Sequence, residues 1–109
     1  MNEEPIKRFT LLVLFQAQQD HVTELTIGLG RGGRPPIRYK VGVAWYDMSP
    51  PPAHIMPDVI AELGRLAAFS RRPFPKEALI DVPFGSVRLR WVIRATSADA
   101  DYVLTPVEQ

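Results

Sequence analysis

The sequence has 109 residues and no cysteine. Disulfide bonds, thiol chemistry and cysteine-ligated metal sites are therefore excluded, and a reducing compartment is compatible with this composition. Long hydrophobic runs are also missing. The longest, Leu11 to Phe15, is far shorter than the roughly 20 residues that a membrane-spanning helix needs. Glu3 and Glu4 near the start, with no small-residue cleavage site after them, argue against a signal peptide. These absences predict a cytoplasmic protein without a membrane span.

An excess of charge of one sign is missing as well. The formal net charge is +1, so the overall composition gives no argument for binding nucleic acid or membranes. Hydrophobic residues make up 46% and charged residues 23%, which indicates a globular chain rather than a disordered one. The length suits one domain, residues 1–109. The two histidines, His21 and His54, have no further ligands at metal-binding spacing, so we expect neither a metal nor a cofactor.

Two segments are predicted to be helical. The stretch from Pro50 to Pro75 contains an amphipathic helix from about 55–57 to Phe69, because an apolar stripe recurs at helical spacing and Pro57 suits only a first turn. Ile6 to Gln19, after a loose arm at residues 1–5, forms the other helix, although its apolar centre also fits a buried strand. The apolar stripe of the helix between Pro50 and Pro75 consists of Ile55, Val59, Leu63 and Leu66.

Five segments are predicted to be strands, and two of them alternate strongly between apolar and polar residues. The resulting order is helix, two strands, helix, three strands, which indicates an α+β domain with a mainly antiparallel sheet. The helix after Pro50 should cover the apolar side of that sheet, where the alternation also places Tyr39, Trp45 and Trp91. The predicted strands are Thr23 to Leu29, Ile37 to Tyr46, Leu79 to Phe84, Val87 to Arg94 and Tyr102 to Leu104, with a tight turn at Gly85 and Ser86.

The polar sides of the two alternating strands are basic. If these strands share a sheet face, that face could bind an acidic partner, a nucleotide or single-stranded nucleic acid. The competing interpretation is an ordinary solvated face whose cations pair with Glu24 and Asp81. Nucleic acid is disfavoured, because the aromatic residues that would stack on bases are predicted on the opposite face. The cations concerned are Arg38, Lys40, Arg88, Arg90 and Arg94.

Arg71 and Arg72 form a second candidate site at the end of the predicted second helix. Guanidinium groups bind phosphate or carboxylate oxygens two at a time. A solvated helix C-terminus, where cations are favoured, is the preferred explanation of the pair. Gly28 to Gly33 matches the pattern G-x-G-x-x-G, but a strand follows it where a dinucleotide site needs a helix N-terminus. No catalytic constellation is recognisable, and we do not expect an enzyme.

Four stretches resemble, in order, the PAS-like N-terminal domain of the type II secretion and type IV pilus assembly ATPases. They are LLVLFQAQQDHVTEL, IRYKVGVAWYDMSPPPAHIMPDVIAEL, SRRPFPKEALIDV and VRLRWVIRATSADADYVL, and they cover about Thr10 to Leu104. The resemblance implies a single PAS-like domain. It also implies that arginines matching Arg71, Arg72 and Arg90 reach toward nucleotide held by a catalytic domain in that family.

The departures from the family are as informative as the matches. No G-x-x-x-x-G-K-[ST] loop occurs, so this sequence lacks the phosphate-binding loop of the family's catalytic domain. Leu79 stands where the family has a further arginine, and Glu24, Leu25 and Thr26 replace its acidic–apolar–histidine triplet. We therefore expect a non-catalytic interaction or regulatory module that binds a secretion or pilus ATPase or associates with itself. The alternative is a small module whose basic face binds nucleotide or nucleic acid.

Overall fold

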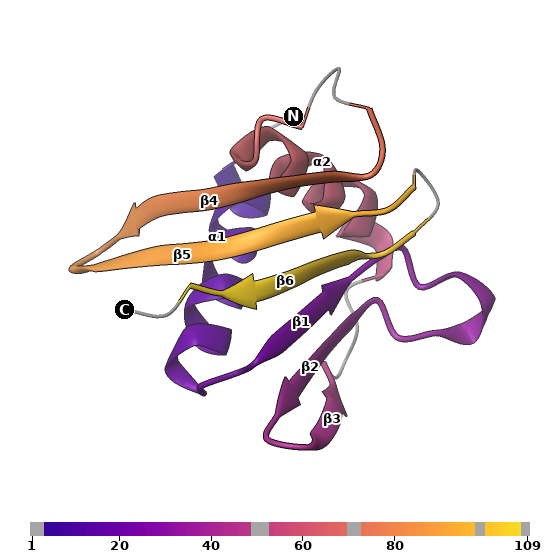
Figure 1. Ribbon diagram of the computed structural model, residues 1–109, viewed down its shortest axis with the longest axis horizontal. Coiled ribbons are helices and arrows are strands. Elements are labelled where there is room, and N and C mark those ends of the chain that lie inside the picture. Colours follow the sequence, from indigo (N-terminus) through magenta and orange to yellow (C-terminus); the bar gives the residue numbers. More distant parts are fainter. Residues whose placement is uncertain (1–3, 49–52, 70–72, 98–99, 108–109) are drawn as a thin grey trace.

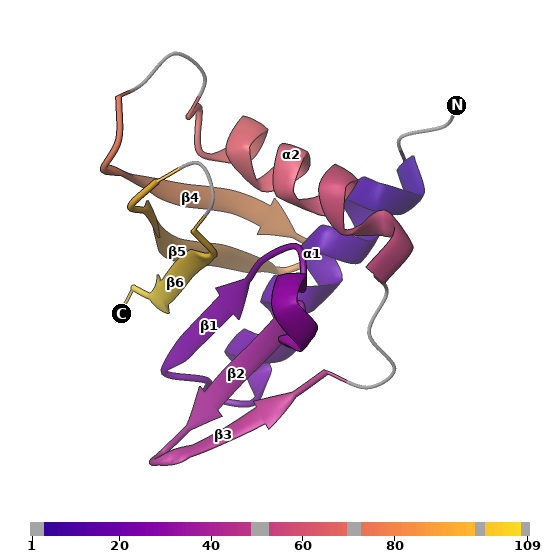
Figure 2. The same cartoon turned by 90° about the vertical axis from the view of Figure 1, so that its right-hand side faces the viewer.

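The computed structural model describes residues 4–48, 53–69, 73–97 and 100–107. Six strands form one antiparallel sheet in the order β3-β2-β1-β6-β5-β4. Both helices lie on the same side of this sheet, as the two perpendicular views show (Figures 1 and 2). The α+β class and the antiparallel sheet predicted from the sequence are thus confirmed. The elements are α1 (Glu4–Gln19), β1 (Glu24–Ile27), β2 (Ile37–Val41), β3 (Ala44–Asp47), α2 (Met56–Leu66), β4 (Lys76–Phe84), β5 (Val87–Ala95) and β6 (Tyr102–Pro106).

The predicted strand from Ile37 to Tyr46 is wrong, because it is a hairpin of two strands. Gly42 has a φ of 62°, and Val41 pairs with Ala44 across the two-residue turn. A two-residue turn with glycine first and a positive φ at that glycine matches the twist of the flanking strands. The chain reverses there, so the alternation that runs through β2 does not continue in phase into β3. This extra hairpin raises the strand count from the expected five to six.

The first helix begins earlier than predicted. Glu4 and Pro5 belong to α1 and not to a loose arm. Proline fits there because amide hydrogens of a first helical turn have no partner within the helix. The alternative that the apolar centre of this segment is a strand is wrong. None of the helices in the described part of the chain is long and apolar enough to cross a membrane.

The second helix ends three residues before the predicted Phe69. Ala68 adopts a left-handed φ of 54°, and the amides of Ala68 and Phe69 donate to the carbonyls of Arg65 and Gly64. This bond pair is the Schellman motif, which satisfies the last carbonyls of a helix and turns the chain away. The turn directs Phe69 into the core, where it is 2% exposed.

The core lies between the helices and the covered face of the sheet. α1 contacts both α2 and β5, so the two helices form one layer over the centre of the sheet. Trp91 is fully buried, as predicted, and alternate residues of β5 accompany it. The residues at the centre of this core are completely inaccessible to solvent: Leu14, Met56, Leu63, Ile80, Leu89, Trp91, Ile93 and Leu104. The opposite face of the sheet carries neither helix (Figure 2).

Candidate functional site: the uncovered face of the sheet

The uncovered face carries a row of side chains that crosses all six strands. Cross-strand pairing aligns them from β3 to β4 through five successive partners. An arginine pairs with a carboxylate at each end of the row, and the middle is neutral. The residues in the row are Asp47, Arg38, Thr26, Val103, Arg94 and Glu77.

At the β4 edge, three arginines of β5 face two carboxylates of β4. Arg94 Nε lies 2.5 Å from Glu77 Oε2, and Arg88 Nε donates to Asp81 Oδ1 at 2.7 Å. Arg90 is the direct cross-strand partner of Asp81. The alternation of β5 aims all three arginines at solvent because Leu89, Trp91 and Ile93 between them are buried under the helices.

Arg90 is the least satisfied of these cations. Its Nε lies 3.5 Å from Asp81 Oδ2, but this buried nitrogen makes no hydrogen bond within the described residues. Asp81 already accepts the hydrogen bond of Arg88 at the shorter distance. A buried guanidinium nitrogen without a hydrogen bond carries a desolvation cost. Among the three arginines of β5, Arg90 is therefore the one whose Nε is not hydrogen-bonded to β4.

At the β3 edge, the structure overturns the prediction for Trp45. Lys40 pairs with Trp45 across the β2–β3 hairpin, so the indole lies on the basic face and is 37% exposed. The Arg38 guanidinium carbon lies 5.1 Å from the ring centroid and the Lys40 Nζ 5.9 Å from it. Both distances fit cation–π attraction. Tyr39, one residue along β2, is on the covered side as expected and stacks on Tyr46 at 5.6 Å.

The face as a whole is close to electrically balanced. Arg38 pairs with Asp47 at 3.0 Å, and Lys40 lies opposite Glu24 across β1 and β2. Among the paired strand residues that the structure describes, five cations therefore share the face with four carboxylates, an excess of one positive charge. The pairs are exposed and each contributes little to stability. What they do is restrict the positions of the long side chains on this surface.

The remaining sequence candidates are the arginine pair and the glycine motif. Arg71 and Arg72 lie outside the described residues. The glycine motif leads from β1 through a short turn at Arg31–Gly33 into β2, so no helix N-terminus follows it. In the described ranges, no three His, Asp or Glu side chains are grouped so that they could hold a metal ion.

Sequence reasoning placed the five cations correctly on one face but missed Trp45 and two of the carboxylates. Asp47 and Glu77 pair with Arg38 and Arg94, whereas only Glu24 and Asp81 were expected. The signal for Trp45 was present at Gly42, because a glycine inside a strand pattern marks a bend or a turn. The carboxylates could not be assigned without the register of β2 with β3 and of β4 with β5.

Comparison with known proteins adds no family to this description. No protein-family model matches the sequence. No curated protein matches it either.

Proposed function

We propose that the protein is a non-catalytic interaction module that binds a partner protein through the uncovered face of its sheet. The observation that carries this proposal is Arg90, a partly buried arginine near the β4 edge of the face that neither helix covers, whose Nε makes no hydrogen bond within the described residues and lies 3.5 Å from Asp81 Oδ2. Half-exposed Trp45 adds an aromatic side chain to the same face. Arginine and tryptophan are the residue types that most often dominate binding energy in protein interfaces.

The partner we propose is an assembly ATPase of the type II secretion or type IV pilus class, in the cytoplasm. The basis is the resemblance to the PAS-like N-terminal domain of those ATPases, together with the absence of a phosphate-binding loop from this sequence. A single antiparallel sheet with both helices on one side agrees with a PAS-like description. We expect a relative of that domain to occupy or extend the surface that the domain itself uses.

The charge balance of the face favours a protein partner over a polyphosphate. Binding to nucleic acid draws its affinity from many unpaired cations that displace counterions. Here most of the cations already face carboxylates, and the described strand residues of the face carry an excess of only one positive charge. A mixed surface of this kind is complementary to another mixed protein surface that presents a carboxylate toward Arg90.

The test is a binding titration between this protein and a full-length assembly ATPase from the same organism. Arg90→Gln removes the under-satisfied guanidinium and should weaken binding about tenfold or more. Arg8→Gln removes an arginine from α1, on the other side of the molecule, and should leave the affinity unchanged. Circular dichroism establishes that both variants are folded. The proposal fails if the wild-type protein shows no association at tens of micromolar, or if both variants bind like the wild type.

A second candidate function, binding of single-stranded nucleic acid, is favoured by one observation. Trp45 lies on the basic face beside Arg38 and Lys40, where a base could stack on its exposed ring. The expected signature is quenching of tryptophan fluorescence by an oligonucleotide, lost in Trp45→Ala and weakened steeply by salt. Absence of quenching at low salt would eliminate this candidate.

A further inference from the structure

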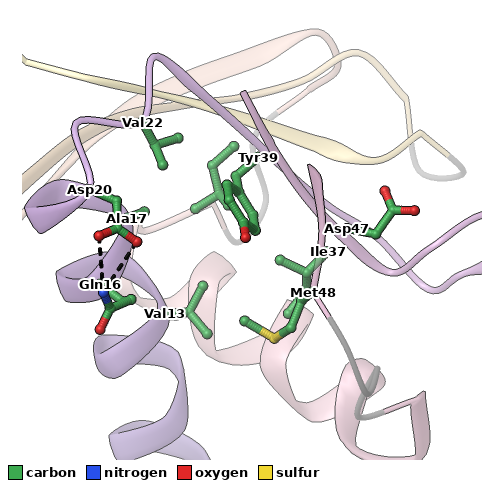
Figure 3. A pocket seen from close by; sticks show the side chains of 10 residues that line it. Val13, Gln16, Ala17, Asp20, Val22, Ile37, Tyr39, Asp47 and Met48 are labelled. Atoms are coloured by element: carbon green, nitrogen blue, oxygen red, sulfur yellow. Dashed lines mark hydrogen bonds between the residues drawn. The ribbon is translucent and has the colours of Figure 1, made fainter. Parts of the chain in front are cut away.

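A cavity lies at the C-terminal end of α1, on the covered side of the sheet and away from the uncovered face. Its volume is about 360 Å³, within the range of small-molecule sites. α1 forms one wall, and β1, β2 and the residues after β3 form the others. Figure 3 shows the Tyr39 ring and the Met48 side chain pointing into the space between these walls.

The wall is mainly apolar, with a small number of polar groups near α1. Val13 and Ala17 face the cavity from the helix, and Ile37 and Tyr39 face it from β2. Such a lining binds the hydrocarbon or aromatic part of a ligand and leaves its orientation to the few polar atoms present. Asp47 is also at the cavity, but its carboxylate points away in Figure 3 and pairs with Arg38 on the other face.

The C-terminal end of α1 carries a carboxylate, whereas helix C-termini favour cations. Asp20 follows the last residue of α1, where the aligned peptide dipoles already produce a negative potential, and the last turn contains no basic residue. Gln16 Nε2 lies 3.2 Å from both carboxylate oxygens of Asp20, but this amide carries no charge. Asp20 makes no salt bridge with any described residue. His21, the adjacent residue, is exposed and has a φ of 57°.

From these contacts we infer that the cavity binds a small amphipathic cation, an aromatic or aliphatic amine. The apolar body would fill the space beside Tyr39, and the ammonium group would pair with Asp20. The cation would offset the charge of the Asp20 carboxylate, which forms no salt bridge with a described residue. It would also be favoured by the partial negative charge of the helix C-terminus, where the amides of His21 and Val22 already donate to the carbonyls of Gln18 and Ala17. The tyrosine ring adds a face on which an aromatic body can stack. This site is independent of the proposed docking face.

Three probes of matched shape test the charge requirement. Tryptamine carries an ammonium group, tryptophol a hydroxyl group and indoleacetate a carboxylate on the same indole. In titrations followed by amide chemical shifts, tryptamine should bind at about millimolar affinity and the alcohol about fivefold more weakly, whereas the acid should not bind. The shifted signals should be those of the cavity wall, in particular Val22, Leu25 and Met48.

Two variants and one control separate the site from general effects. Asp20→Asn removes the negative charge and should lower the affinity for tryptamine to that for tryptophol. The affinity for tryptophol should be the same in this variant as in the wild type. Ala17→Leu adds bulk inside the cavity and should abolish binding of both. Asp58→Asn removes a carboxylate from the first turn of α2, which does not line the cavity, and should change nothing. The inference is overturned if no probe shifts the wall signals, if the three probes bind equally, or if Asp20→Asn leaves the preference for the amine intact.

Discussion

At the scale of single residues, Tyr102 gives the folded protein a pH dependence. Its ring packs edge-on against Phe69 at 5.7 Å, and burial raises the pKa of its phenol above the ordinary value of 10.0. The unfolded chain releases this proton at a lower pH than the folded chain does. The stability associated with Tyr102 is therefore complete below about pH 10 and is lost as the pH rises through the folded-state pKa.

We expect Tyr102→Phe to flatten this dependence. Urea denaturation between about pH 9 and about pH 11 should show a smaller decline in the free energy of unfolding than in the wild type, because the ring stays and the ionising group is removed. Tyr46→Phe, at a half-exposed tyrosine of β3, is the matched control for removal of a phenol at the surface. If the free energy of unfolding of Tyr102→Phe declines with pH as steeply as that of the wild type, ionisation of Tyr102 does not cause the decline.

Residue-level predictions from the sequence succeeded where a strand is regular and failed where its phase changes. Arg88, Arg90 and Arg94 lie on one face because β5 alternates without interruption over nine residues. Trp45 was assigned to the core because Val43 continues the apolar pattern past Gly42, yet Val43 is 94% exposed in the turn. Alternation alone cannot identify the residue at which a chain reverses.

At the scale of elements, the two tight hairpins have the same construction. Gly42 begins the turn between β2 and β3, and Gly85 begins the turn between β4 and β5, with φ values of 62° and 61°. The turn at Gly85 was predicted because serine follows the glycine. The turn at Gly42 was not, because a β-branched valine follows it. The backbone needs only the glycine at the first position.

Gly42→Ala should lower the stability by about 1 kcal/mol, because a residue with a Cβ is strained at this positive φ. Nothing lies within 4 Å of the position of an added Cβ, so the cost is conformational and not steric. Val43→Ala in the same turn should be almost neutral. Denaturation midpoints in urea measure both effects. Equal midpoints for Gly42→Ala and the wild type would show that the turn does not depend on the glycine.

The end of α2 offers a stabilising substitution. Ala68 occupies the left-handed position of the Schellman motif, which glycine adopts without strain. Ala68→Gly should therefore raise the free energy of unfolding by about 0.5 kcal/mol, after the extra flexibility of glycine in the unfolded chain is subtracted. Ala61→Gly, in the middle of the same helix, should instead lower it by about 1 kcal/mol. Thermal or urea denaturation measures the stability of both variants. A loss of stability in Ala68→Gly as well as in Ala61→Gly would contradict the left-handed position assigned to Ala68.

At the scale of the whole molecule, the sequence predicted the layers but not the cavity. Apolar stripes and alternation indicated that helices cover one side of the sheet and that a polar side remains open. The cavity beside Tyr39 forms where residues of α1, β1, β2 and the end of β3 meet, which is a property of tertiary packing. The same holds for the strand order, in which the last strand of the chain lies between the first strand and β5.

From that position of β6 we expect the fold to be a single cooperative unit. β6 pairs with β1 on one side and with β5 on the other, and Leu104 at its centre is completely buried. Without it, β3-β2-β1 and β5-β4 would each present an unpaired edge over a shared core. Deletion of the chain from Tyr102 onward should therefore abolish the folded state and not merely remove one edge strand.

Amide spectra provide the measurement: the truncated chain should lose signal dispersion throughout the molecule, including in β2 and β4, which do not pair with β6. Val103→Thr on the uncovered face is the control, because it keeps the strand and should stay folded with a small change in stability. If either group of strands keeps native-like dispersion after the truncation, the two halves of the sheet fold independently. In that case the uncovered face would be two separate surfaces, with Arg90 and Trp45 on different ones.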